Sequence, residues 1–266
     1  MRAHDIEYQL FGDDMQFVEI ELDPREAVMA EAGAMMYMAG GVEMETVFGD
    51  GNDQGGGLMG KLMGAGKRVL TGESLFMTQF TNNSNEPKKV AFAAAYPGKI
   101  FPVDLTEYGG KLVAQKDSYL CSAKGINIGI AFQKKIGVGF FGGEGFIMQK
   151  LEGDGLAFLH AGGTIIEKEL ASGEVLKIDT GCLVALTSTV DYNIEMVKGI
   201  KSAVFGGEGL FFATLRGPGK VWLQSLPFSR MADRILSSAR AHGGSSKGEG
   251  SALDLLGGLG NLLDGK

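Results

Sequence analysis

A short block that joins a Gly-Glu pair to large apolar residues occurs three times in this chain. The copies are GESLF at residues 72–76, GEGFI at 143–147 and GEGLF at 207–211. The steps between successive block glutamates, from Glu73 to Glu144 and from Glu144 to Glu208, are similar in length. They are too long for a solenoid unit and suit a small β-module. The recurrence therefore predicts a fold built from three related β-modules.

Strand-like alternation supports a β fold. Val18, Ile20 and Leu22 alternate with Glu19 and Glu21, as is typical of a half-buried strand. Glycine supplies 43 of the 266 residues, about twice the usual share, and glycine pairs separate the apolar runs as turns do. Short strands with regular glycine turns predict an all-β sandwich or barrel.

The copies align over longer stretches when Gly33, Asp117 and Thr180 are taken as equivalent. The intervals from Asp117 and from Thr180 to the next block glutamate are then nearly equal. The interval from Gly33 is longer, and its excess coincides with a glycine-rich loop at 49–66. We therefore expect one triplicated β domain with pseudo-threefold symmetry. Its expected bounds are 1–227, with repeats at about 5–98, 99–163 and 164–227.

The sequence changes character after Pro227. Phe228, Met231 and Ile235 follow helical spacing, and proline is common at a helix start. We expect a helix at 228–241 and a flexible Gly/Ser-rich tail at 242–266.

Charge and cysteine content narrow the partners. A net charge of −7 argues against a nucleic-acid partner. The two cysteines, Cys121 and Cys182, lie in apolar runs and are expected to be free thiols. The N-terminus lacks an apolar signal segment, and the longest uninterrupted apolar run, at 90–96, is too short to span a bilayer. These features predict a cytoplasmic protein.

No motif meets the requirements of a cofactor or catalytic site. Residues 137–142 match the dinucleotide fingerprint in letters, but they lead into a strand instead of a helix. His4, His160 and His242 lack metal-ligand spacing, and we expect His160 to be half-buried with satisfied hydrogen bonds. We predict no catalytic residue, no cofactor and a non-enzymatic protein.

The repeated glutamates, Glu73, Glu144 and Glu208, have two interpretations. If the repeats surround an axis, the three carboxylates could converge on one cation and act as metal ligands. In the alternative, each carboxylate accepts backbone N–H bonds at a glycine turn. The Gly-Glu-Gly context before a strand favours the alternative.

The glycine-rich loop offers the other candidate contact. It carries flexible apolar side chains close to basic ones, a combination that can touch a protein partner or a membrane surface. A loop that packs on the β core or crosses to a neighbouring subunit would have the same composition. The candidate contact residues are Leu58, Met59, Leu62, Met63, Lys67 and Arg68.

These motifs resemble a bacterial and archaeal family related to the mitochondrial biogenesis proteins called altered inheritance of mitochondria. The resemblance rests on residues 70–76, on the later Gly-Gly-Glu-Gly blocks and on the preceding glycine-rich loop, and it covers residues 1–230 or so. It implies a triplicated module similar to the subunit of the tryptophan RNA-binding attenuation protein, of the β-sandwich or double-stranded β-helix type. The chain shows no counterpart of that protein's tryptophan-binding or RNA-binding motifs, and the family has no established catalytic activity.

Three functions stay open from sequence. The first is a structural or interaction protein, which is expected to self-associate and to act as an oligomeric scaffold or as a membrane-peripheral or protein partner. The alternative is a protein that binds a small ligand or metal in a cleft between repeats. The third, RNA binding by analogy of fold, is opposed by the net charge of −7.

Overall fold

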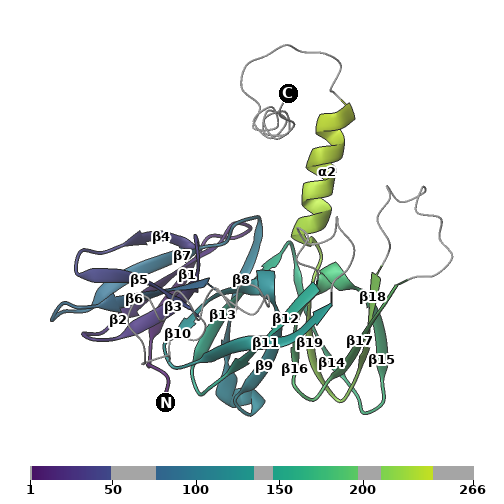
Figure 1. Cartoon of the computed structure of the whole chain (residues 1–266), viewed down its shortest axis with the longest axis horizontal. Helices are drawn as coiled ribbons and strands as arrows, with labels where there is room; N and C mark the ends of the chain where they lie inside the picture. Colours follow the sequence, from purple (N-terminus) through teal and green to yellow (C-terminus); the bar gives the residue numbers. More distant parts are fainter. Residues whose placement is uncertain (1, 49–75, 135–145, 197–210, 242–266) are drawn as a thin grey trace, which may run out of the picture. The chain divides into compact units, whose positions relative to one another are not determined.

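The structure is a computed structural model, and it describes residues 2–48, 76–134, 146–196 and 211–241. In these ranges the regular structure is mostly β-strand, with short 3-10 helices between some strands and one α-helix at the end (Figure 1). The predicted all-β class with a C-terminal helix is therefore confirmed. The chain divides into two units, Met1–Arg230 and Met231–Lys266. The first holds all the described strands and is called the β unit below.

Strand β1 is followed by three segments of six strands each. The bounds of β1 and of the first segment are β1 (Glu7–Phe11), β2 (Phe17–Leu22), β3 (Ala27–Glu31), β4 (Met35–Met38), β5 (Val42–Phe48), β6 (Phe76–Asn82) and β7 (Lys88–Ala93). The second segment holds β8 (Gly98–Asp104), β9 (Lys111–Gln115), β10 (Tyr119–Ala123), β11 (Asn127–Lys134), β12 (Phe146–Glu152) and β13 (Leu156–Gly162). The third holds β14 (Ile165–Leu170), β15 (Val175–Asp179), β16 (Leu183–Thr187), β17 (Asp191–Met196), β18 (Phe211–Arg216) and β19 (Gly219–Gln224).

The described strands form four antiparallel sheets. Two end sheets have the strand orders β1-β2-β7-β4 and β15-β18-β17. Two central sheets have the orders β5-β6-β3-β10-β13-β8 and β11-β12-β9-β16-β19-β14. Each central sheet thus takes three strands from one segment and three from the next.

Strand pairing follows one scheme in all three segments. The first and third strands of a segment pair with its sixth strand, and the second and fourth pair with its fifth. A register shift recurs in the third strand, between Met35 and Tyr37, between Tyr119 and Cys121, and between Leu183 and Ala185. A β-bulge at one fixed place is a conserved device for bending a strand, so the three segments share this local feature as well as their order.

The pairing corrects the sequence alignment by one position in the third segment. Glu31, Gln115 and Asp179 hold the same position, since each is opposite the residue four places after a block glutamate. Gly181 is therefore the equivalent of Asp117, and the choice of Thr180 was wrong. With Gly181 the interval to the block glutamate is equal to that in the second segment.

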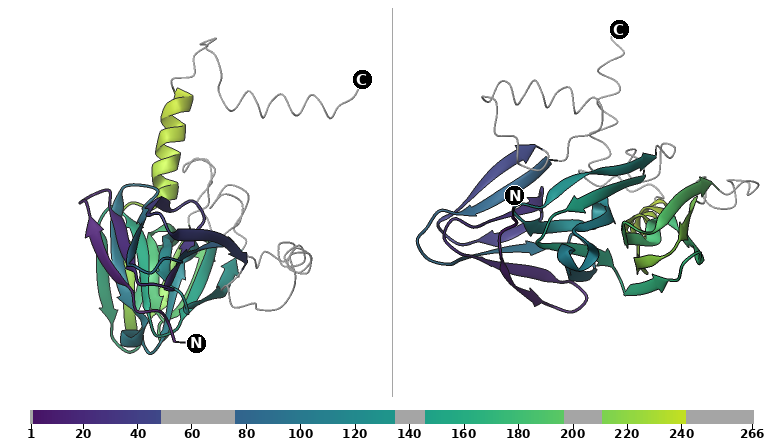
Figure 2. Two further views of the ribbon diagram at one scale, coloured as in Figure 1. Left: turned by 90° about the vertical axis from the view of Figure 1, so that its left-hand side faces the viewer. Right: turned by 90° about the horizontal axis from the view of Figure 1, so that it is seen from below.

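The strands that would meet if the three segments closed around an axis are β4 and β15. They lie at opposite ends of the β unit in the view of Figure 1 and in the right-hand view of Figure 2. Each is the edge of an end sheet. The described pairing does not bear out the predicted pseudo-threefold axis, and the segments form an open row.

Three clusters of buried apolar side chains hold the sheets together. The cluster of the first segment draws Val18 and Ile20 from β2, Val28 from β3 and Phe80 from β6, and it also includes Phe158 of the second segment. The next joins β9, β10 and β13 to Trp222 of β19. Because the first of these clusters takes side chains from two segments and the second takes them from all three, neighbouring segments share their cores. Burial of this apolar surface is the main stabilising contribution.

Helix α2 (Phe228–Ala241) begins directly after Pro227. Its first residues belong to the β unit, where Phe228 packs against Tyr96 with ring centroids 5.2 Å apart and Arg230 pairs with Asp179 at 3.1 Å. None of the helices in the described ranges has both the length and the apolar character needed to cross a bilayer.

Candidate functional site

The candidate metal and contact residues predicted from the sequence lie outside the described residues. This applies to the three block glutamates, Glu73, Glu144 and Glu208, and to all six contact residues of the glycine-rich loop, Leu58, Met59, Leu62, Met63, Lys67 and Arg68. The metal-site and loop-contact hypotheses stay predictions. In the part of the chain that the structure describes, no three His, Cys, Asp or Glu side chains gather as metal ligands would.

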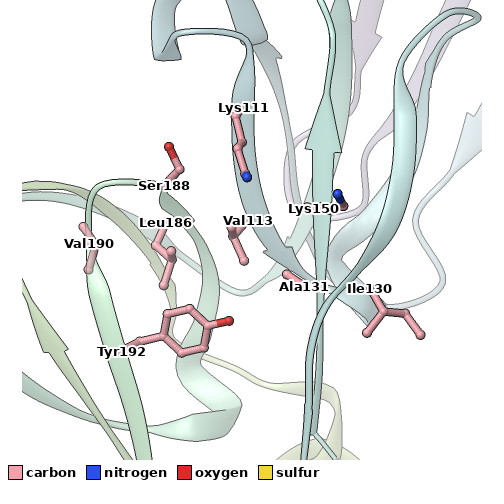
Figure 3. A pocket seen from close by; sticks show the side chains of 9 residues that line it. All are labelled: Lys111, Val113, Ile130, Ala131, Lys150, Leu186, Ser188, Val190 and Tyr192. Carbon is pink, nitrogen blue, oxygen red and sulfur yellow. The ribbon is translucent and has the colours of Figure 1, made fainter. Parts of the chain in front are cut away.

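A pocket of about 360 Å³ lies where the second and third segments meet (Figure 3). Lys111 and Val113 come from β9 and Lys150 from β12, while Leu186 of β16, which is the strand partner of Val113, and Tyr192 of β17 complete this part of the lining. The remaining lining residues are Ile130, Ala131, Ser188 and Val190. The lining is therefore mixed, with ammonium and hydroxyl groups among apolar side chains.

The charge of this pocket is partly neutralised by Glu152. Its carboxylate lies 2.9 Å from Lys150 Nζ and 3.2 Å from Lys111 Nζ. The hydrogen bond from Lys150, followed by that from Lys111, lowers the pKa of Glu152. The three groups together carry one positive charge, which suits a small monoanion with an apolar body.

A second candidate is a group of titratable side chains around Glu31. Burial, followed by the charge of Asp117, raises the pKa of Glu31 to about 7. Tyr96 is influenced by both carboxyl groups, and burial raises its pKa above the ordinary range for tyrosine. A carboxyl group that titrates near neutral pH is suited to general acid–base work. None of these residues lines the pocket of Figure 3.

His160 lies next to this group and differs from its prediction. It is 3% exposed rather than half-buried, its ring lies 4.4 Å from that of Tyr96, and its Nε2 atom has no hydrogen-bond partner. Burial lowers its pKa to about 4, so the imidazole is neutral in the folded protein at neutral pH. The paired strand lies close to the ring, since a Cβ at Gly98 would come within 2.8 Å of Nε2, and only glycine leaves the imidazole room there.

The two cysteines are free thiols, as the sequence predicts. Cys121 is buried in β10, and burial raises its pKa well above the ordinary value. Cys182 lies in a short 3-10 helix (Thr180–Cys182), and burial raises its pKa as well. A raised thiol pKa disfavours the nucleophilic thiolate.

The most exposed apolar surface of a described strand is at β4. Its residues Met35, Met36, Tyr37 and Met38 are all exposed, whereas every residue of the corresponding strands β10 and β16 is buried. A strand edge that carries apolar side chains is a ready surface for pairing with another chain. Sequence reasoning missed this surface, although the unbroken run of large apolar residues at 35–38 was its signal.

The family described as Mitochondrial biogenesis AIM24 matches residues 8–226, which span all three segments. The chain belongs to the AIM24 family. An uncharacterised protein of Streptococcus pyogenes serotype M6 is 33% identical to this chain over 226 residues, which cover 83% of this chain and 86% of that protein.

A solved structure shows the same architecture. The crystal structure of a Streptococcus pyogenes protein superposes on this AIM24-family chain with a TM-score of 0.68 and 26% sequence identity. The match covers 88% of this chain and 99% of the other. The predicted family is confirmed, whereas the predicted likeness to the tryptophan RNA-binding attenuation protein stays a prediction.

Proposed function

We propose that this AIM24-family chain is a non-enzymatic structural protein that acts by associating with itself. The observation that carries the proposal is the exposure of β4, whose counterparts in the other two segments are wholly buried. Four consecutive large apolar residues on an open sheet edge favour association, because both the apolar surface and the unpaired backbone groups gain from a partner strand.

The titratable groups support the non-enzymatic half of the proposal. The thiols of Cys121 and Cys182 have raised pKa values, and the neutral imidazole of His160 is buried in the core. Burial and Asp117 raise the pKa of Glu31 to about 7, but Glu31 is not among the residues that line the pocket. These arrangements are those of packed side chains rather than of an assembled nucleophile and base.

The test is the mass of the full chain in solution as a function of concentration. We expect size-exclusion chromatography with multi-angle light scattering to show species larger than the 28.1 kDa chain, with a share that rises with protein concentration. A single 28.1 kDa species from micromolar to millimolar concentration would contradict the proposal.

The pocket of Figure 3 favours a second candidate, binding of a small anionic ligand between segments. Lys111 and Lys150 line the pocket beside apolar side chains, and with Glu152 they carry one net positive charge. A panel of short-chain carboxylates, tested by thermal shift, would reveal such binding as a rise in melting temperature. The rise should be lost in Lys150→Met and kept in Lys168→Met, which alters an exposed lysine of β14.

A further inference from the structure

The segments of this chain are joined to each other by one kind of contact, used twice. The second strand of one segment pairs with the third strand of the next, as β3 with β10 and β9 with β16. The register is the same in both joints. In the first joint Ser122 is opposite Met29. In the second joint the equivalent residues, Leu186 and Val113, are opposite each other in the same way.

The two end sheets present the two halves of a third joint. Strand β4 is the third strand of the first segment and has no second-strand partner in the described sheets. Strand β15 is the second strand of the last segment and has no third-strand partner there. Because these strands lie at opposite ends of the β unit (Figure 1), each can be completed by another chain.

We propose that β15 of one copy pairs antiparallel with β4 of a second copy, in the register of the internal joints. This inference rests on the proposed self-association and specifies its surface. The shared register places Met38 of the second copy opposite Lys177, and Tyr37 opposite Ile178. The end sheets then merge into one sheet with the strand order of the central sheets, extended by β1.

An aromatic side chain on each segment supports the same joint. Phe158 and Trp222 stand at one position of the sixth strand, opposite the small residues Cys121 and Ala185. In the first segment the sizes are exchanged, since Ala91 stands at that position and Tyr37 is opposite it. Each segment therefore offers one large ring at this place.

The three rings differ in what covers them. Phe158 is fully buried against Tyr8, at 4.9 Å between centroids, and Trp222 is 4% exposed against Tyr108, at 5.4 Å. In both cases the covering residue comes from the structure that precedes the segment in the row. Tyr37 has no preceding segment in its own chain and is 39% exposed. A preceding copy would cover it in the same way.

The polar partners of the ring also recur in the first and third segments. Trp222 donates to Glu167, which also receives Lys220 at 2.7 Å. Tyr37 donates to Glu19, which also receives Lys89 at 2.7 Å. The register makes Glu19 the counterpart of Glu167. The first segment thus carries the same set of ring, glutamate and lysine as the third segment. In the third segment the ring is buried within the chain, whereas in the first segment it is exposed.

The opposite end of the chain carries the matching apolar surface. Phe101 of the second segment stacks on Trp222 at 6.4 Å, and its counterpart in the third segment is Ile166. Ile166 is 49% exposed and Val175 of β15 is 45% exposed. We assign Ile166 as the seat for Tyr37 of the second copy, and Val175, on the strand face of Lys177, as an apolar contact for its β4.

The joint is head-to-tail, because it uses a different surface on each copy. Such heterologous contacts continue from copy to copy, and they end in a ring if the rotation closes or in a filament if it does not. Lys177 occupies the position of Met29 and Val113, so it brings a charge to a place that is apolar in the internal joints. Lys177→Met should therefore tighten association, lowering its midpoint concentration by about tenfold.

Disulfide trapping tests the register. In a Cys182→Ser background, one chain carries Met38→Cys and a second, co-expressed chain carries Lys177→Cys. Directly opposite residues of an antiparallel pair have Cα atoms about 4.5–5.5 Å apart, within the range that a disulfide spans. We expect the pair to cross-link on mild oxidation, and neither chain alone to form a covalent dimer.

The matched control replaces Lys177→Cys by Val175→Cys, which is exposed and on the same strand face but displaced by two positions. Its cross-link with Met38→Cys should be several-fold weaker, because a displacement of two positions adds about 6.6 Å along the strand. Equal cross-linking of both pairs would overturn the register. A covalent dimer from Met38→Cys alone would show symmetric pairing of β4 with β4 and overturn the joint.

Light scattering on the same samples separates this inference from the proposed function. Multi-chain species without the in-register cross-link would overturn the joint and leave self-association standing. A single-chain mass at every concentration would overturn both.

Discussion

Glu31 provides the prediction with the most definite magnitude. Its folded pKa of about 7 lies above the ordinary value of 4.5 because burial and Asp117 disfavour the charged carboxylate. Between pH 4.5 and 7 the folded chain holds a proton that the unfolded chain has lost. The stability contribution of the neutral carboxyl is therefore fully present below pH 4.5 and is lost as pH rises through 7.

Glu31→Gln should remove this loss, because the amide resembles the neutral carboxyl and does not titrate. The quantity measured is the free energy of unfolding of the variant minus that of the parent. At about 1.36 kcal/mol per pH unit, this difference should increase by about 2–3 kcal/mol from pH 5 to pH 8. His160 contributes the opposite slope, since its pKa is lowered to about 4. Because His160 is present in both the parent and the variant, its contribution cancels when the two free energies are subtracted.

Urea unfolding at several pH values measures this difference. Trp222 is the single tryptophan and is buried, so its fluorescence reports the exposure of the shared core. Glu45→Gln, on the exposed face of β5, is the matched control and should show no such trend. The reasoning is refuted if the difference between Glu31→Gln and the parent changes by less than about 0.5 kcal/mol from pH 5 to pH 8.

Three further predictions concern association, packing and thiol reactivity. Tyr37→Ala should raise the midpoint concentration of self-association about tenfold or more by light scattering, while Met44→Ala, also an exposed side chain of the first segment, should leave it unchanged. Phe158→Ala should lower the free energy of unfolding by about 3–5 kcal/mol in urea titrations, because the ring is fully buried; a loss below about 1 kcal/mol would contradict its core role. Cys182 should react with an aromatic disulfide reagent slowly and Cys121 not at all until the chain is unfolded, since Cys121 is fully buried; equal rates in the folded protein would contradict this burial.

The fold class could be predicted because it rests on local patterns. The alternation from Val18 to Leu22 became β2, with the valine, isoleucine and leucine buried and the glutamates between them less so. The third-segment alignment failed for a local reason as well. Taking Thr180 as the equivalent of Gly33 also equates Val175 with the buried Val28, but Val175 lies on the exposed side of β15 and is equivalent to Ala27.

The candidate surfaces could not be predicted, because they depend on which strands are neighbours. Met35–Met38 has the composition of a buried strand, and only the sheet order shows that its outer neighbour is missing. The raised pKa of Glu31 likewise requires Asp117, which lies in another segment and is brought near by the pairing of β3 with β10. Sequence carries no signal for either proximity without the strand register.

The two central sheets have a consequence for how this protein comes apart. Since each is shared by two segments, no segment can open alone without tearing a six-stranded ladder, and the middle of the row should open only with the whole β unit. The end sheets belong to one segment each and can fray independently, so amide hydrogen exchange should be fastest in β4 and β15. The strands that are easiest to loosen are thus the ones that a neighbouring copy would hold, and assembly would stabilise the chain most where it is weakest.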